Sequence, residues 1–131
     1  MDANFTITVQ NELDLVRVSM SGFFFPSDVE RFRHARDEAH LLLRSLPNQH
    51  LTIVDIREMK VQAQETVAAF QAVLGEKRHH GRRLAIVAGS SLARSQAKRA
   101  ASQRVVAYFA AVEKAEQWLL QSDVIPQATA A

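Results

Sequence analysis

The 131-residue sequence has no cysteine, no long hydrophobic run and no N-terminal stretch of the signal-peptide type. Without cysteine, disulfide bonds, thiol nucleophiles and cysteine-ligated zinc or iron–sulfur sites are all excluded. The longest apolar run, residues 20–26, is interrupted by Ser21 and Gly22, whereas a transmembrane helix needs roughly 18 apolar residues. Residues 1–4 lack the basic and then apolar pattern of a secretory signal. We therefore expect a cytoplasmic protein with no membrane-spanning segment.

The composition is that of a globular protein. Hydrophobic residues make up 47% and charged residues 23% of the chain, which excludes a disordered or collagen-like protein. A chain of this length is close to one domain, and folding buries roughly two thirds of the surface that the unfolded chain exposes. No internal repeat or linker divides it. We expect a single domain over residues 1–131, with an ordered core at about 4–120 and a C-terminal tail that frays.

Charge is distributed unevenly along the chain. The formal net charge is only +2, yet residues 77–104 contain no Asp or Glu and carry Lys77, Arg78, Arg82, Arg83, Arg94, Lys98, Arg99 and Arg104. This basic block is either a surface that faces a partner or an ordinary solvated surface. No aromatic residue lies within it to stack on bases, so we do not expect nucleic acid as the partner.

Hydrophobic patterning predicts five strands. Alternation over residues 5–9 and 13–20, with a short polar connection, predicts an antiparallel hairpin. In the second strand, Val16, Val18 and Met20 share one face. Nearly continuous apolar runs at 51–56 and 84–88 predict strands that are covered on both faces, and residues 105–109 predict a fifth strand.

Four helices are predicted between and after these strands. The run Ser27–Glu30 is a capping box, followed by an apolar stripe that Pro47 ends and that contains Phe32, Ala35, Ala39, Leu42 and Leu46. A second helix is centred on Val67–Leu74 and extends to His79 or His80, with Gly81 as a left-handed cap. A third follows Gly89-Ser90-Ser91, and a fourth covers residues 112–120.

The order of these elements predicts an α/β fold. Strands that alternate with helices indicate right-handed crossovers and a mostly parallel sheet, here of five strands with four helices. If helices collect on one face, the other face is left largely uncovered. An exposed face that is apolar in its middle and polar at its edge suits an isologous contact, so we expect a homodimer.

Three segments are distinctive: Leu51–Arg57, a strand bearing Asp55; Arg82–Gly89; and Tyr108-Phe109 followed by Ala115–Leu119. They resemble segments of the STAS superfamily, whose best-known members are anti-sigma-factor antagonists. The resemblance covers about residues 4–120 and is strongest to a STAS-like bacterial branch of unassigned function. It implies an N-terminal β-hairpin followed by a β-α superhelix, an architecture also related to the lipid-binding CRAL-TRIO fold.

The resemblance also identifies a missing feature. In the antagonists, a phosphorylatable Ser follows the Asp-bearing strand at the start of the next helix. The equivalent stretch here, Lys60–Thr66, contains no Ser, and Thr66 is its only hydroxyl residue. We therefore expect no serine switch after the third strand.

Asp55 is the first candidate for a binding role. A carboxylate at the end of a buried parallel strand lies at the edge where α/β sheets bind ligands. The alternative is that Asp55 accepts backbone N–H bonds from the segment that follows it. No second carboxylate is placed to form an acid–base pair with Asp55.

An anion site is the second candidate. Ser90 and Ser91 precede a helix whose first turn has free N–H groups, while Arg94 and Lys98 lie on one face of it. The alternative is simple capping by a serine. Arg82 and Arg83 should lie at the opposite end of the fourth strand and not share the site.

Two further features complete the candidates. The adjacent His79 and His80 point about 100° apart on a helix, so we expect no metal site, and nothing in the sequence indicates a cofactor. Three consecutive aromatics cannot all enter one core, so at least one of Phe23, Phe24 and Phe25 should be exposed, at an interface or in a pocket.

No pattern specific to an enzyme is present. The hypothesis is a non-enzymatic cytoplasmic interaction or regulatory module that binds a protein partner or itself. The alternative is a carrier or sensor of a small apolar or anionic ligand, by analogy with the CRAL-TRIO fold.

Overall fold

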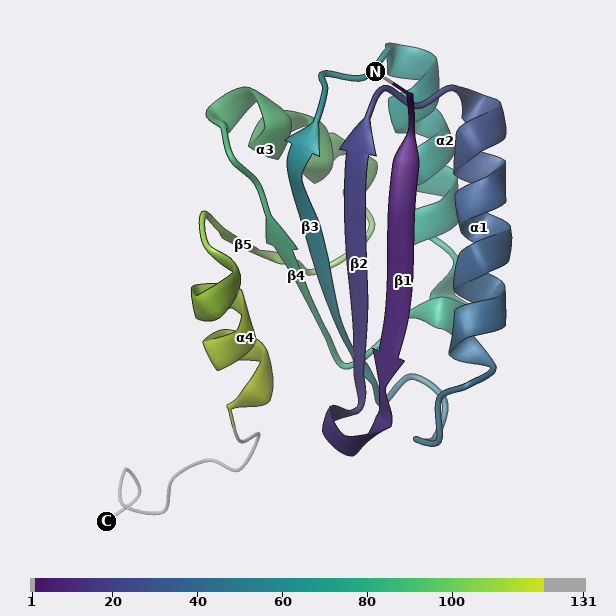
Figure 1. Ribbon diagram of the computed structural model, residues 1–131, viewed down its shortest axis with the longest axis vertical. Coiled ribbons are helices and arrows are strands. Elements are labelled where there is room, and N and C mark those ends of the chain that lie inside the picture. Colours follow the sequence, from purple (N-terminus) through teal and green to yellow (C-terminus); the bar gives the residue numbers. More distant parts are fainter. Residues whose placement is uncertain (1, 122–131) are drawn as a thin grey trace.

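A computed structural model describes residues 2–121 of the chain (Figure 1). The expected fraying of the tail falls outside these residues. The strands are β1 (Asn4–Gln10), β2 (Leu15–Gly22), β3 (Leu51–Met59), β4 (Arg83–Val87) and β5 (Ala107–Phe109). The helices are α1 (Pro26–His40), α2 (Gln64–Leu74), α3 (Ser91–Ala100) and α4 (Val112–Leu120), with single 3₁₀ turns at Asn11–Leu13 and Lys77–His79.

The five strands form one sheet in the order β1-β2-β3-β4-β5. Strands β1 and β2 are antiparallel, and every later pair is parallel, which confirms the predicted hairpin and mostly parallel sheet. Helices α1, α2 and α3 pack against one another on one face, whereas α4 packs against β3, β4 and β5 from the other (Figure 1). The molecule is therefore a three-layer arrangement with one thin outer layer.

The core is divided by the sheet. On the face of the three helices, Val16, Val18 and Met20 of β2 join the larger apolar cluster, as their alternation predicted. The opposite cluster is smaller and consists of Leu15, Leu51, Ile53, Ala85, Val87, Ala115 and Leu119. The expectation of a largely uncovered second face is therefore wrong for β3–β5, because α4 buries the apolar side chains there.

Helix α1 begins and ends earlier than predicted. Pro26 is its first residue, a position that tolerates proline because the missing N–H has no helical partner. The Phe25 amide donates to Asp28 Oδ2 at 2.8 Å, so Asp28, and not the predicted Ser27–Glu30 pair, makes the N-terminal cap. The helix ends at His40, which leaves Leu42 and Leu46 exposed rather than in the core.

The hairpin turn explains why α1 ends early. The side chain of Asn11 donates to the Leu42 carbonyl at 3.0 Å and accepts from the Arg44 amide at 3.0 Å. These bonds satisfy backbone groups that a continuing helix would otherwise use. Such a contact joins residues 31 positions apart and has no local sequence signal.

Strand β3 is longer than predicted. It continues past Ile56 to Met59 and contains a shift in its pairing with β2. Ser19 pairs with Asp55, whereas Ser21, two residues later, pairs with Glu58, three residues later. The extra residue is a β-bulge. Strand β5, in contrast, spans only three residues, and Val105 before it is almost fully exposed.

The segment between α2 and β4 also differs from the prediction. Helix α2 ends at Leu74, and Lys77–His79 forms a separate 3₁₀ turn. Gly81 is not a left-handed cap, because its φ is not positive; among the glycines of residues 2–121, Gly22 alone has a positive φ. Gly81 is instead required by a close approach: a Cβ there would lie 2.2 Å from the His50 carbonyl oxygen.

Candidate functional site

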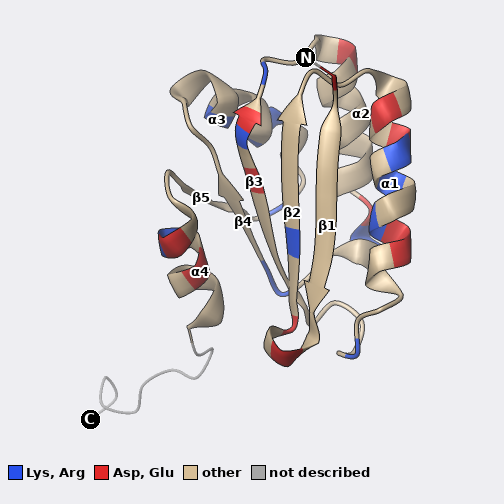
Figure 2. Cartoon of the chain, viewed as in Figure 1, with Lys and Arg blue, Asp and Glu red and all other residues tan. Residues whose placement is uncertain are grey.

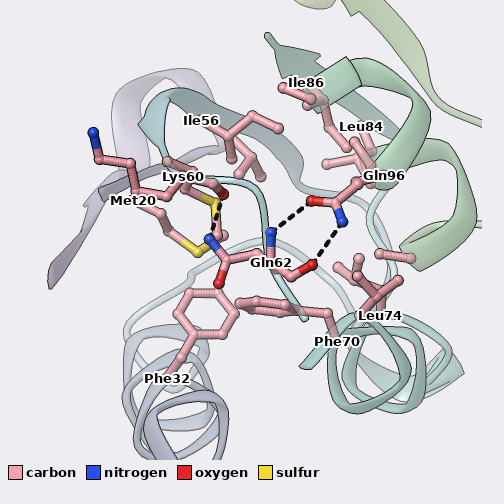
Figure 3. Close-up of a pocket in the computed structure, with 16 residues that line it drawn as sticks. Met20, Phe32, Ile56, Lys60, Gln62, Phe70, Leu74, Leu84, Ile86 and Gln96 are labelled. Atoms are coloured by element: carbon pink, nitrogen blue, oxygen red, sulfur yellow. Dashed lines mark hydrogen bonds between the residues drawn. The ribbon is translucent and has the colours of Figure 1, made fainter. Parts of the chain in front are cut away.

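The most prominent feature is an apolar cavity of about 90 Å³ between the sheet and helices α2 and α3 (Figure 3). The strands contribute Met20, Val54, Ile56, Met59, Leu84 and Ile86. Phe70 and Leu74 of α2 face the small residues Ala93, Ala97 and Ala100 of α3 across it. Because the apolar residues that α3 brings to this interface are all alanines, beside the polar Gln96, the helices leave space that larger apolar side chains would fill.

A pair of glutamines closes one side of this cavity. The Gln62 amide donates to Gln96 Oε1, and Gln96 Nε2 donates to the Gln62 carbonyl, each at 2.8 Å (Figure 3). The Gln62 side chain accepts from the Phe24 amide at 2.7 Å and donates to the Gly22 carbonyl at 3.0 Å. These bonds tie the segment after β3 to both α3 and the segment before α1.

A second, smaller cavity of about 40 Å³ lies next to the first. Its polar walls are Arg36 and His40 of α1, Glu76, His79 and His80 after α2, and Arg104 after α3. His40 Nδ1 and His79 Nδ1 are 3.0 Å apart, and His50 packs against His40 with ring centroids 4.7 Å apart. No local sequence pattern indicates this cluster, since its histidines lie in three separate segments.

Burial and neighbouring positive charge keep these histidines neutral. Burial, assisted by His50, His79 and Arg36, lowers the pKa of His40 to about 3. Burial and then Arg104 lower the pKa of His50 to about 4. Burial likewise lowers the pKa of His79 and His80. The cluster therefore holds neutral imidazoles at neutral pH.

The arginines of the cluster differ in their partners. Arg36 donates to Glu76 Oε1 at 2.6 Å and to Asp37 Oδ1 at 2.9 Å. Arg33 also binds Glu76, and this bond, with that from Arg36, lowers the pKa of Glu76 to about 2. The guanidinium of Arg104 is partly buried and makes no hydrogen bond or ion pair with residues 2–121. Burial, with Arg36 nearby, lowers the pKa of Arg104 to about 10.

Asp55 lies in the middle of β3, at the bulge, and not at the end of the strand as predicted. Its carboxylate accepts from the Arg57 amide at 3.1 Å and from the Arg57 guanidinium at 2.8 and 3.0 Å. The hydrogen bonds from Arg57 lower the pKa of Asp55. The carboxylate thus satisfies an amide at the bulge, which is the structural alternative considered from the sequence; a ligand role stays a prediction.

The basic block is divided between opposite ends of β4 (Figure 2). At the start of β4, Arg83 Nη1 donates to the carbonyls of Trp118 and Leu119, and Arg82 Nε donates to the Gln49 carbonyl. These arginines therefore have a structural role, because they donate hydrogen bonds to backbone carbonyls of other segments.

At the other end of β4, Ser90 caps α3 by accepting from the Ala93 amide at 3.1 Å. Ser91 is exposed, and the Lys98 ammonium lies 5.6 Å from the centroid of the Tyr108 ring. Burial raises the pKa of Tyr108, and the positive charge of the nearby Arg94 partly opposes this rise. Anion binding by Ser90, Ser91, Arg94 and Lys98 stays a prediction.

The three consecutive phenylalanines have different environments. Phe24 is fully buried and packs on Phe70, whereas Phe25 is exposed and contacts the partly buried Phe23 edge-on at 5.3 Å. Val61 after β3 and Leu92 after β4 are likewise more than half exposed. Since β2, β3 and β4 are parallel, all these segments lie where the strands end. We call Phe23, Phe25, Val61 and Leu92 the carboxyl edge.

Thr66 occupies the stretch in which the resemblance places a phosphorylatable residue. Its side chain is buried, with 1% exposure, and Thr66 Oγ1 donates to the Phe24 carbonyl at 2.8 Å. The hydroxyl is therefore inaccessible to a kinase in the folded protein.

Residues 2–121 contain neither a metal-binding cluster nor a membrane-spanning helix. No group of three or more His, Cys, Asp or Glu side chains within residues 2–121 is arranged to hold a metal ion, the histidine cluster included. In the same part of the chain, no helix is long and apolar enough to cross a membrane.

Comparison with solved structures identifies the fold. An uncharacterised DUF3478-family protein with a SpoIIAA-like fold from Shewanella loihica PV-4 has a TM-score of 0.67 and 17% sequence identity, over 91% of this chain and 96% of that one. An anti-sigma factor antagonist from Mycobacterium paratuberculosis has a TM-score of 0.60 and 13% identity, over 90% and 96%. No family model and no curated protein matches the sequence. The chain therefore has a STAS-like fold, as its sequence segments predicted.

Proposed function

We propose that this protein is a non-enzymatic regulatory module of the cytoplasm that binds a protein partner through the carboxyl edge. The observation that carries the proposal is the exposure of Phe25, Val61 and Leu92 on three consecutive crossover segments at one end of the sheet. Exposed apolar side chains gathered in one region are typical of interaction sites. The similar structure of an anti-sigma factor antagonist also supports a protein partner.

The control of this module does not involve phosphorylation after β3. Burial of the Thr66 hydroxyl and the absence of serine from Lys60–Thr66 support this conclusion. Incubation with a kinase of the antagonist class, followed by mass spectrometry, should leave Thr66 unmodified. Stoichiometric phosphate on Thr66 in the folded protein contradicts the proposal.

Site-specific crosslinking tests the proposed surface. A photoreactive amino acid at position 25 or 61 should crosslink the same protein in cells, because both positions lie at the carboxyl edge. The matched control is position 41, where Leu41 is also exposed but follows α1 at the other end of the sheet. Equal crosslinking from position 41, or different proteins from 25 and 61, contradicts a defined surface.

A second candidate function is supported by the apolar cavity. In this reading the protein carries or senses a small apolar ligand held between the sheet, α2 and α3. The alanines of α3 keep the space open, so Ala97→Leu should fill it and weaken binding of a small apolar probe such as 1-hexanol at least tenfold. Ser95→Leu is the control, because Ser95 lies on the exposed side of the same helix. Absence of 1-hexanol binding to the unaltered protein contradicts this candidate.

A further inference from the structure

The two cavities are consecutive compartments of one gap. Phe32, Val54, Leu74 and Leu84 line both the cavity of about 90 Å³ and that of about 40 Å³. They come from α1, α2, β3 and β4, so the gap runs along the inner face of the sheet beneath the helices. A ligand that enters the larger compartment is therefore separated from the smaller one only by apolar side chains.

The two compartments differ in chemistry. Apolar side chains dominate the larger one, and the glutamines at its margin bind each other. The smaller one has the histidine and arginine cluster as its wall. Asp37 and Glu76 neutralise Arg33 and Arg36, which leaves Arg104 as a partly buried cation without a counter-charge among residues 2–121.

A second polar group in the cluster also lacks a partner. His50 is 4% exposed, its Nε2 atom has no hydrogen-bond partner, and its ring packs against His40 in the wall of the smaller compartment. Burying an unpaired charge costs free energy, which a ligand of opposite charge recovers. The Arg104 guanidinium lines the smaller compartment and is such a charge, so it points to a missing anion, whereas His50 is neutral and lines neither compartment.

We propose that the gap binds a single small amphiphile, with its apolar body in the larger compartment and its anionic head, a carboxylate or phosphate, on Arg104 in the smaller one. This rests on the second candidate function and adds the ligand class. The two cavities, of about 90 and 40 Å³, limit the size of the ligand. For comparison, an engineered cavity of about 150 Å³ holds one benzene molecule, so the ligand here must be small. An arginine fork pairs well with a carboxylate or phosphate.

Lys60 offers a competing position for the head group, because it lines the outer end of the larger compartment. It is exposed, so an ion pair there is screened by water and contributes little. The proposal therefore predicts an ordered ligand whose charged end is at Arg104 and not at Lys60. Replacement of either residue by glutamine distinguishes the two orientations.

The experiment is an NMR titration of the full chain at pH 7.5 with hexanoate, 1-hexanol and acetate. Hexanoate should bind at least tenfold more tightly than either 1-hexanol, which lacks the charge, or acetate, which lacks the body. Arg104→Gln should weaken hexanoate by about tenfold or more and leave 1-hexanol unchanged. Lys60→Gln and the exposed control Arg99→Gln should change neither by more than about twofold.

The outcomes separate this inference from the function on which it rests. Equal binding of hexanoate and 1-hexanol, or a loss of hexanoate with Lys60→Gln but not Arg104→Gln, overturns the proposed head group and leaves an apolar-ligand protein. If neither compound binds, both ideas are wrong. Should Arg104→Gln fail to fold, nuclear Overhauser contacts decide: the carboxyl end of hexanoate must lie near Arg104 and its methyl group near Ala97.

Discussion

Gln62 is a buried polar residue, with 8% exposure, whose side chain joins the segment after β3 to the segment before α1. We expect Gln62→Leu to lower the free energy of unfolding by about 2–4 kcal/mol, because the Phe24 amide and the Gly22 carbonyl lose their partner. Urea unfolding measures this loss. Gln64→Leu is the control, since Gln64 is exposed two residues later, and it should change stability by less than about 0.5 kcal/mol. If Gln62→Leu and Gln64→Leu change the free energy of unfolding equally, the hydrogen bonds of the Gln62 side chain do not contribute to stability.

The buried histidines predict that stability falls as the pH is lowered. In the unfolded chain, histidine has a pKa near 6.5, whereas that of His40 is about 3 and that of His50 about 4 in the folded protein. Below pH 6.5 the unfolded state therefore binds more protons, and each histidine removes up to about 1.4 kcal/mol per pH unit until its folded pKa is reached. Above about pH 7.5 these groups have no effect.

Urea unfolding at pH 7.5 and pH 5.5 tests this dependence. We expect a loss of about 2–3 kcal/mol between the two values from His40 and His50 together. His50→Phe should reduce this difference by about 1.4 kcal/mol, whatever its effect on absolute stability. Gln64→Leu should leave it unchanged, because Gln64 is exposed and does not titrate. If all three proteins lose the same stability between pH 7.5 and pH 5.5, groups other than His50 cause the pH dependence.

At the scale of the element, α4 depends on Arg83. Arg83 Nη1 donates to the Leu119 carbonyl at 2.9 Å and its guanidinium lies 5.8 Å from the Trp118 ring, so it stabilises the C-terminal end of the helix. We expect Arg83→Gln to lower the free energy of unfolding by about 1–2 kcal/mol. Trp118 is the sole tryptophan, so its fluorescence reports directly on this helix.

Arg99→Gln is the control for this prediction. Arg99 is exposed on α3, and its replacement should leave both the unfolding midpoint and the emission of Trp118 unchanged. If Arg83→Gln lowers stability without any change at Trp118 or in amide exchange of α4, the arginine acts on β4 rather than on the helix.

At the scale of the whole molecule, the predicted homodimer cannot use the sheet face that the sequence suggested and needs a different surface. The apolar part of the second sheet face is buried by α4, whereas Thr6 and Thr8 leave β1 polar on that side. The carboxyl edge is the exposed apolar alternative. We predict a two-chain mass in sedimentation velocity at tens of micromolar and a single-chain mass for Phe25→Asp. Leu41→Asp should retain the dimer, and a single-chain mass for the unaltered protein contradicts the prediction.

The sequence by itself determined the order of elements and the strand faces. Alternation in β2, apolar runs in β3 and β4, and the serine cap of α3 depend on residues close in sequence, so local patterns predict them. Local sterics also predict that one of Phe23, Phe24 and Phe25 lies outside the core, and the tertiary structure decides that it is Phe25. Where the predictions failed, as at the end of α1 and the length of β3, a distant residue decides the outcome: Asn11 for α1 and the pairing with β2 for β3.

The tertiary structure alone decided where the candidate sites are. The cavity exists because α2 and α3 meet over the sheet and the apolar residues of α3 there are all alanines. The cluster of His40, His50, His79 and Arg104 joins segments from four parts of the chain. Neither produces a local pattern. Burial and neighbouring positive charge, which give these groups their altered pKa values, arise only when the chain has folded around them.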